Sequence, residues 1–190
     1  MSKGNFTINR NTQIILEGSG LEKSAKFLND HFKKTVGFAL PISKTAINTS
    51  KIVLNYERMD HQFPGAYTME INDKEIYIAG DNEAGVFYGI QTLIQLLPEK
   101  TYYPLSIPAL SIKDHPRFQY RGMHLDVGRH FFSVGYIKNY IDYLASYKLS
   151  LPIVLILNIQ ILFESTPRVW ATFSLSTKSK LGKISVVLPL

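Results

Sequence analysis

Apolar residues recur at every third or fourth position between residues 21 and 36, with lysine and glutamate between them. The residues that carry this period are Leu21, Ala25, Leu28, Phe32 and Val36. A spacing near 3.6 places such side chains on one face of a helix. The pattern therefore predicts an amphipathic helix that ends at Gly37. A short apolar run at residues 12–17 precedes it and predicts a strand, with a turn at residues 18–20.

Strict alternation of apolar and polar residues replaces this period further along the chain. Residues 66–71 and 75–79 both alternate, and the residues 72–74 between them, Asn-Asp-Lys, have turn-forming side chains. Two alternating runs joined by such a turn predict a β-hairpin. Residues 51–56 form one more apolar run, which predicts another strand.

A second helix is predicted after the hairpin, with Asp81 or Asn82 as its N-cap and Pro98 at its end. One face of this helix is apolar, and its residues are Val86, Phe87, Ile90, Leu93, Ile94 and Leu97. Gly85 and Gly89 lie four residues apart on it, and close packing of the helix against a sheet explains them. A phosphate-binding loop would need a tighter glycine cluster that precedes the helix.

The second half of the chain predicts a change of domain. Residues 105–112 are extended and interrupted by proline, which favours an edge strand or a connector. Residues 114–118 contain a proline and predict a domain boundary. Residues 118–127 then predict a buried strand, and Ser133 caps a helix that runs to about Lys148. The residues expected to face inward from this helix are Tyr136, Ile137, Tyr140, Ile141 and Leu144. A strand followed by a helix is how a parallel (β/α)8 barrel begins.

Composition argues against several classes of function. The net charge is +6, but the basic residues are dispersed, and the longest basic run, Lys33-Lys34, fits a solvated helix face. Nucleic-acid binding needs a clustered electropositive face, so no nucleic-acid partner is expected. The 190 residues hold no cysteine, which excludes disulfides, thiolate metal sites and a cysteine nucleophile. No metal or cofactor is expected. The first ten residues lack an apolar segment of signal-peptide length, so the chain as written is expected in the cytoplasm.

Two stretches of the chain resemble glycoside hydrolase family 20, the β-N-acetylhexosaminidases. The first is GAYTMEINDKEIYIAG at residues 65–80 with AGVFYGIQTLIQL beginning at residue 84, and it resembles the small accessory domain of these enzymes. The second contains RGMHLDVGRHF at residues 121–131, with residues 137–149 behind it, and it resembles the first strand and helix of the catalytic barrel. Together the resemblance covers roughly residues 10–150.

The resemblance implies an α+β fold in three parts. Residues 1–113 would form a small accessory domain of sheet and helices, zincin-like as in family 20 hexosaminidases. Residues 114–150 would form a linker and the first βα unit of an incomplete (β/α)8 barrel. Residues 151–190 do not match the family. In this family the parent enzymes are often periplasmic, secreted or lysosomal.

The resemblance also implies a sugar contact at Arg129, just past the first barrel strand. The family uses the matching arginine to hold hydroxyls of the terminal N-acetylhexosamine, and a guanidinium suits this because its donors form a fixed fork. A plainer alternative is that Arg129 pairs with Asp126 and fixes the end of the strand. Arg121 is expected on the structural face of the barrel, and His124 and His130 are expected to serve packing or hydrogen bonding.

In the full-length family the reaction is a substrate-assisted, retaining hydrolysis of terminal N-acetylhexosamine. The acetamido oxygen attacks the anomeric carbon, a glutamic acid protonates the leaving oxygen, and an adjacent aspartate orients the acetamide. No Asp is followed directly by Glu in this sequence, so no catalytic residue is expected in the chain. Three functions stay open: a hexosaminidase by descent that is inactive as this chain, a non-catalytic carbohydrate-binding or interaction module, and a structural fragment. The expected partners are N-acetylhexosamine-containing glycans.

The tail departs abruptly from this pattern. Residues 151–190 contain one acidic residue, Glu164, and no histidine, whereas residues 1–150 contain fourteen acidic residues and all five histidines. A membrane anchor would account for the apolar run at 151–163, but 13 residues are short for a span, and no membrane partner is expected. A divergent barrel strand near residues 153–157, an evolved alternative ending, and a slip of the reading frame near Ser150 are the remaining possibilities. The loss of acidic residues and of periodicity favours the slip. The open barrel edge could also lead to self-association.

Overall fold

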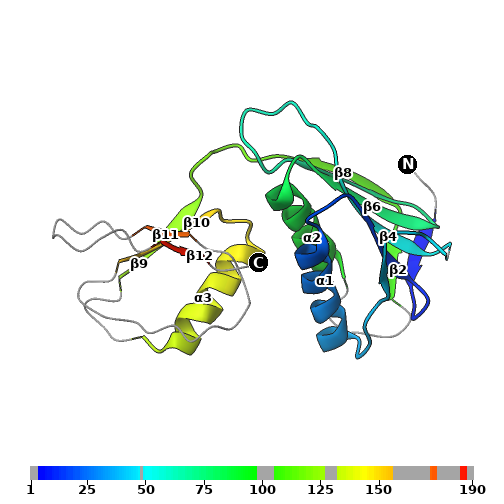
Figure 1. Cartoon of the computed structure of the whole chain (residues 1–190), viewed down its shortest axis with the longest axis horizontal. Coiled ribbons are helices and arrows are strands. Elements are labelled where there is room, and N and C mark those ends of the chain that lie inside the picture. The colour runs from blue at the N-terminus through cyan, green and yellow to red at the C-terminus, as the bar shows by residue number, and fades with distance from the viewer. Residues whose placement is uncertain are drawn as a thin grey trace. The chain divides into compact units, whose positions relative to one another are not determined.

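The computed structural model describes residues 4–47, 49–97, 105–126, 132–155, 172–174 and 185–187 (Figure 1). The chain divides into two compact units, Met1–Gln119 and Tyr120–Leu190. The elements of the first unit are β1 (Asn5–Ile8), β2 (Gln13–Glu17), α1 (Glu22–Thr35), β3 (Ile42–Ser43), β4 (Lys51–Tyr56), β5 (Tyr67–Ile71), β6 (Glu75–Gly80), α2 (Glu83–Leu96), β7 (Leu105–Pro108) and β8 (Leu110–Asp114). Those of the second unit are β9 (Gly122–Asp126), α3 (Val134–Ser146), β10 (Leu151–Leu155), β11 (Thr172–Ser174) and β12 (Ser185–Val187). The domain boundaries expected from the sequence stay predictions.

A six-stranded mixed sheet with two helices on one face forms the first unit. Its strand order is β3-β2-β4-β6-β5-β8. The first four strands of that order run parallel, while β5 runs antiparallel to both β6 and β8. Helices α1 and α2 lie side by side on the same face of the sheet (Figure 1). Strands β1 and β7 pair separately as an antiparallel ribbon. The unit is therefore α+β, as the sequence predicts.

The core of this unit lies between the sheet and the helices. Alternate strand residues are fully buried and lie in register across the sheet, among them Ile52, Leu54, Ile76, Ile78 and Met69. Helix α1 and its N-cap Leu21 contribute the predicted apolar positions Leu21, Ala25, Leu28 and Phe32, all 0% exposed. On the opposite face of the same strands most side chains are polar, as alternation along a strand predicts, but Val53 and Ala79 on that face are buried as well.

Several local predictions are confirmed by this unit. Helix α1 stops where expected, since Val36 is its C-cap and Gly37 has a left-handed φ of +82° that favours glycine. The predicted hairpin is the antiparallel pair β5–β6, and Asn72 Oδ1 accepts hydrogen bonds from the backbone N–H groups of Lys74 and Glu75, at 2.8 Å each. The proline-interrupted segment forms β7 and β8, and β8 is an edge strand. Strands β1 and β3 were not predicted.

Helix α2 starts on one of the two expected N-caps. Asn82 has an extended backbone, and its Oδ1 accepts a hydrogen bond from the Gly85 N–H at 2.9 Å. Asp81 has a different role, because both of its carboxylate oxygens accept from the Gly65 N–H, at 3.0 and 2.9 Å. The sequence therefore located the cap, and the structure assigns it to Asn82.

Asn82→Ala is expected to lower the free energy of unfolding by about 1 kcal/mol, because the first turn of α2 loses its side-chain acceptor. Chemical denaturation followed by circular dichroism measures this. Asn82→Asp keeps the acceptor and is the matched control, with an expected change near zero. Equal losses for both variants would contradict the capping role.

The two glycines of α2 lie where the helix meets the sheet. A Cβ on Gly89 would lie 2.5 Å from Ile78 Cγ2 and 3.2 Å from the Tyr67 ring. A Cβ on Gly85 would overlap the backbone carbonyl oxygen of Ala66. The close packing that the sequence predicted for this pair is confirmed.

The second unit contains a parallel βαβ arrangement. Strand β9 pairs in parallel with β10, from Gly122 opposite Leu151 to Asp126 opposite Leu155, and α3 connects them. Ser133 caps α3 as predicted, since its Oγ accepts from the Tyr136 N–H at 3.2 Å.

Two predictions about burial in this unit are wrong. Ile137, Ile141 and Leu144 are buried as expected, but Tyr136 is 49% exposed, because it lies on the side of α3 away from those three residues. The stretch predicted as a buried strand from residue 118 starts only at Gly122, and Phe118 and Met123 are 70% and 53% exposed. Among the described residues β9 has a single strand neighbour, so part of its apolar surface remains exposed.

One of the possibilities left open for the tail was a barrel strand near residues 153–157, and the structure has a strand there, β10, which begins two residues earlier. Most of the tail beyond it lies outside the described residues, apart from the short antiparallel pair β11–β12. No helix within the described part of the chain has the length and apolar character needed to cross a membrane.

Candidate functional site

The carboxyl end of β9 is the candidate site. This strand ends at Asp126, and the chain then continues toward Arg129. Barrel enzymes carry their active-site groups just after the carboxyl ends of the strands, so the position is the expected one for a substrate-binding side chain. Arg129 and His130 themselves lie outside the described residues, and the side chains of His124 and Asp126 also do. The proposed sugar contact of Arg129 and its alternative pairing with Asp126 therefore stay predictions.

The amino end of the same strand is held by Arg121. Its Nε donates a hydrogen bond to the backbone carbonyl of Lys148 at 3.3 Å, and its own carbonyl accepts from the Ser150 N–H at 2.7 Å. Lys148 has a left-handed φ of 58°, so the turn between α3 and β10 includes a strained residue. Arg121 thus joins the start of β9 to this turn, which is the structural role expected from the sequence.

Aromatic side chains line the exposed side of α3. Tyr136, Tyr143 and Tyr147 recur at helical spacing, and Phe132 stacks on Tyr136 with ring centroids 4.8 Å apart. Burial raises the pKa of Tyr140, and the neighbouring Tyr136 raises it further. A tyrosine with a raised pKa stays protonated at neutral pH, so it is not an activated nucleophile.

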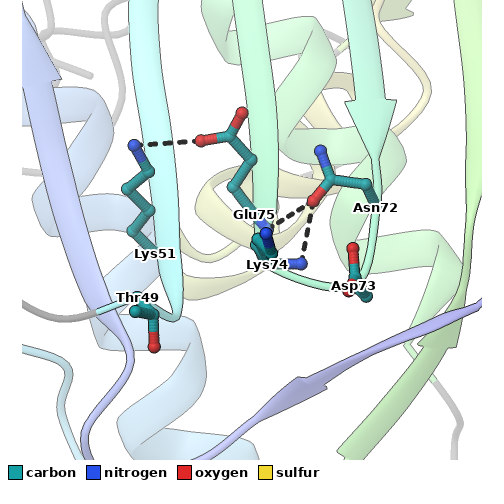
Figure 2. A pocket seen from close by; sticks show the side chains of 6 residues that line it. All are labelled: Thr49, Lys51, Asn72, Asp73, Lys74 and Glu75. Carbon is teal, nitrogen blue, oxygen red and sulfur yellow. Dashed lines mark hydrogen bonds and ion pairs between the residues drawn. The ribbon is translucent and has the colours of Figure 1, made fainter.

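A polar hollow of about 540 Å³ lies at the turn end of the β5–β6 hairpin (Figure 2). Its lining residues are Thr49, Lys51, Asn72, Asp73, Lys74 and Glu75. Lys51 Nζ lies 3.0 Å from Glu75 Oε2, and Asn72 Oδ1 accepts hydrogen bonds from two backbone N–H groups of the turn (Figure 2). The lining residues include no aromatic ring and no large apolar side chain against which a sugar could pack. The hollow is therefore best explained as the surface of the hairpin turn.

Within the described residues no group of three or more His, Cys, Asp or Glu side chains is placed to hold a metal ion. Sequence reasoning did miss one side-chain cluster. His61 and His115, far apart in the chain, stack with ring centroids 4.3 Å apart. A pairing of this kind leaves no local signal in a single sequence.

Comparison with known proteins places the first unit and the start of the second in one family. Residues 1–115 match the sequence model described as "Glycosyl hydrolase family 20, domain 2", and residues 118–151 match "Glycosyl hydrolase family 20, catalytic domain". The chain belongs to glycosyl hydrolase family 20. Its first unit is the domain that precedes the catalytic domain, and β9 with α3 is the start of the catalytic barrel, as the two motifs predicted.

Curated family 20 relatives are longer than this chain. A β-hexosaminidase of Porphyromonas gingivalis is 33% identical over 158 residues, which are 78% of this chain and 20% of that protein. An N,N'-diacetylchitobiase of Vibrio harveyi is 42% identical over 86 residues, 45% of this chain and 10% of that protein. The chain thus spans a fifth or less of the length of these two relatives.

Solved family 20 structures share the fold. A β-N-acetylhexosaminidase of Streptomyces coelicolor superposes with a TM-score of 0.75 at 30% identity, over 82% of this chain and 32% of that one. An exo β-N-acetylglucosaminidase of Vibrio harveyi, solved in complex with N-acetylglucosamine, gives a TM-score of 0.71 at 28% identity, over 81% of this chain and 23% of that one. The match to the catalytic-domain model ends at residue 151, next to the point where the sequence pattern changes.

Proposed function

We propose that this protein is by descent a β-N-acetylhexosaminidase, an enzyme that removes terminal non-reducing N-acetylhexosamine from glycans. The observation that carries the proposal is the β9–α3 unit, whose residues 118–151 match the catalytic domain of family 20. Relatives named β-hexosaminidase and N,N'-diacetylchitobiase, and a relative solved with N-acetylglucosamine bound, support the substrate class.

The part of the reaction assigned to this chain is substrate binding. Arg129 would present its guanidinium fork to neighbouring hydroxyls of the terminal sugar, which orients the ring for attack by its own acetamido oxygen. The acid and the orienting carboxylate of the family mechanism are an adjacent Asp-Glu pair, and none occurs in the 190 residues. The chain alone is therefore proposed to be inactive.

The test is to express a gene in which residues 1–150 are followed by the remainder of a family 20 catalytic barrel. After the segment that matches residues 137–149, the family pattern continues with a strand that carries His-x-His and paired aspartates. If the reading frame slips near Ser150, another frame of the coding DNA encodes this strand, and sequencing checks this. Expression of the corrected gene is expected to give turnover of a chromogenic N-acetyl-β-glucosaminide with retention at the anomeric carbon. The 190-residue chain is the control, with no expected turnover. A folded, corrected enzyme without turnover would contradict the proposal.

A carbohydrate-binding or interaction module is the second candidate. It is favoured by the first unit, Met1–Gln119, which has a closed core of its own and is a compact body. Equilibrium binding of N-acetylglucosamine to the 190-residue chain distinguishes a sugar site in the first unit from a sugar site at Arg129. Saturable binding that persists in Arg129→Ala would locate a sugar site in the first unit, whereas binding that disappears would locate it at the start of the barrel.

A further inference from the structure

Helix α3 presents two stripes of large side chains. The apolar stripe consists of Ile137, Ile141 and Leu144, which are buried. The other is a tyrosine stripe, whose members are Tyr136, Tyr140, Tyr143 and the C-cap Tyr147. At about 100° per residue, the tyrosine stripe lies roughly a quarter turn around the helix from the apolar stripe.

The tyrosine stripe is open to solvent. Tyr136, Tyr143 and Tyr147 are 49%, 68% and 75% exposed, and Tyr140 between them is half-buried. The Phe132 ring stacks on Tyr136, which extends the stripe beyond the start of the helix. Neighbouring exposed aromatic rings of this kind mark an interaction surface more often than a bare solvated face.

No charged side chain of α3 interrupts the tyrosine stripe. The charged residues of this helix are Lys138 and Asp142, and helical spacing places both on the side away from the tyrosines. Removing the stripe from water therefore desolvates no ion. Tyrosine is also enriched, and charge depleted, in the cores of protein interfaces.

The position of the stripe on α3 indicates what covers it. In a (β/α)8 barrel the helices lie side by side around the strands, so each helix packs sideways against another helix. A quarter turn from the apolar stripe is such a sideways face. Within the described part of the second unit α3 has no helical neighbour. The occupant that this face fits is therefore another helix.

We propose that the tyrosine stripe pairs α3 with α3 of a second copy of this chain, antiparallel about a two-fold axis. The tyrosines are spaced by 4, 3 and 4 residues, which is the same pattern in both directions. Antiparallel pairing therefore places Tyr136 opposite Tyr147 of the partner subunit, and Tyr140 opposite Tyr143 of the partner subunit. Every layer of the contact then brings aromatic rings together, and the two helix dipoles oppose each other.

The area of this contact corresponds to a weak dimer. With about 200 Å² on a fully exposed tyrosine, the three exposed tyrosines offer about 400 Å² per copy. Tyr140 and Phe132 add to this area, so the pair buries about 1,000 Å² in total, less than the about 1,200–2,000 Å² of stable complexes. The dimer is therefore reversible, and its share rises with protein concentration.

Sedimentation equilibrium of the 190-residue chain tests the pairing. We expect the average mass to rise from one chain toward two between about 1 μM and about 500 μM. The double variant Tyr143→Glu, Tyr147→Glu should weaken the dimer about tenfold or more, because the contact would desolvate carboxylates. Tyr143→Phe keeps the ring and should keep the dimer. Tyr120→Glu places the same charge at an exposed tyrosine outside α3 and is the matched control, with the association of the wild type.

The orientation of the two helices can be tested because the chain contains no cysteine. In the antiparallel pair the two thiols of Tyr143→Cys are offset by about 4.5 Å along the helix axis, and those of Tyr136→Cys by about 16.5 Å. A short bismaleimide is therefore expected to cross-link Tyr143→Cys into dimers and to leave Tyr136→Cys monomeric.

Three results would overturn the proposal. They are a mass of one chain at every concentration, association that survives in the double glutamate variant, and equal cross-linking of the two cysteine variants. Survival in the glutamate variant would assign the contact to another surface, such as the open edge of β9 or β10. Circular dichroism of each variant confirms that it is folded. No step of this test depends on the proposed hydrolase activity.

Discussion

Gly85→Ala is expected to lower the free energy of unfolding of the accessory domain by about 3 kcal/mol or more. The added methyl would overlap the carbonyl oxygen of Ala66 and lie 2.8 Å from Asp81 Oδ1. Neither atom can move cheaply, because the Ala66 carbonyl accepts from the Asp81 N–H at 3.0 Å and the Asp81 carboxylate holds Gly65. Helix α2 would have to move away from the sheet that it covers. Urea denaturation followed by far-ultraviolet circular dichroism measures the loss.

Two further glycine-to-alanine variants provide comparison values for the loss of stability in Gly85→Ala. Gly89→Ala meets side-chain atoms of Ile78 and Tyr67, which can shift by rotation, so a smaller loss is expected. Gly135→Ala on α3 meets only Ser133 Oγ at 3.9 Å, and a gain of about 0.5–1 kcal/mol from helix propensity is expected there. A Gly85→Ala protein that unfolds at the same urea concentration as the wild type would refute the close approach of α2 to the sheet.

The elements that could be predicted from the sequence are those with strong local signals. The period of α1 is interrupted by nothing between Glu22 and Thr35, and a glycine with positive φ follows it. The β5–β6 hairpin is specified by alternation and by Asn72, whose side chain binds the next backbone N–H groups. Such signals act within a few residues, so a single sequence contains them in full.

Non-local features could not be predicted in this way. Strand β1 is only four residues long and is completed by β7, its partner near the other end of the unit. Strand β3 has two residues and exists because β2 offers it a parallel edge. The His61–His115 stack likewise depends on β8 ending beside the β4–β5 loop. Pairing partners of this kind are set by the whole fold rather than by local propensity.

Part of the candidate site could be predicted from the sequence, and part of it could not. The residue type and position of Arg129 allow two roles, and only the family resemblance favours sugar binding over a pair with Asp126. For Arg121 the geometry is decisive, since its guanidinium binds the Lys148 carbonyl at the amino end of β9. In the sequence Arg121 precedes β9 and Arg129 follows it, which makes the two arginines a matched pair for experiment.

In the enzyme encoded by the frame-corrected gene, Arg129→Ala is expected to lower kcat/KM by about 100-fold or more. Loss of two charge-assisted hydrogen bonds to sugar hydroxyls removes about 3 kcal/mol or more of transition-state binding. Arg129→Lys keeps the charge but not the fork, so an intermediate loss is expected.

The matched control for this variant is Arg121→Ala. It is expected to lower the stability of the α3–β10 turn while kcat/KM of the folded enzyme stays within a few-fold of wild type. If Arg129 instead pairs with Asp126, Arg129→Ala will lower the melting temperature and leave kcat/KM nearly unchanged, because the sugar loses no direct contact. Measuring both quantities on both variants therefore separates binding from strand fixation: a sugar contact changes catalysis at one arginine only, whereas two structural arginines change stability alone.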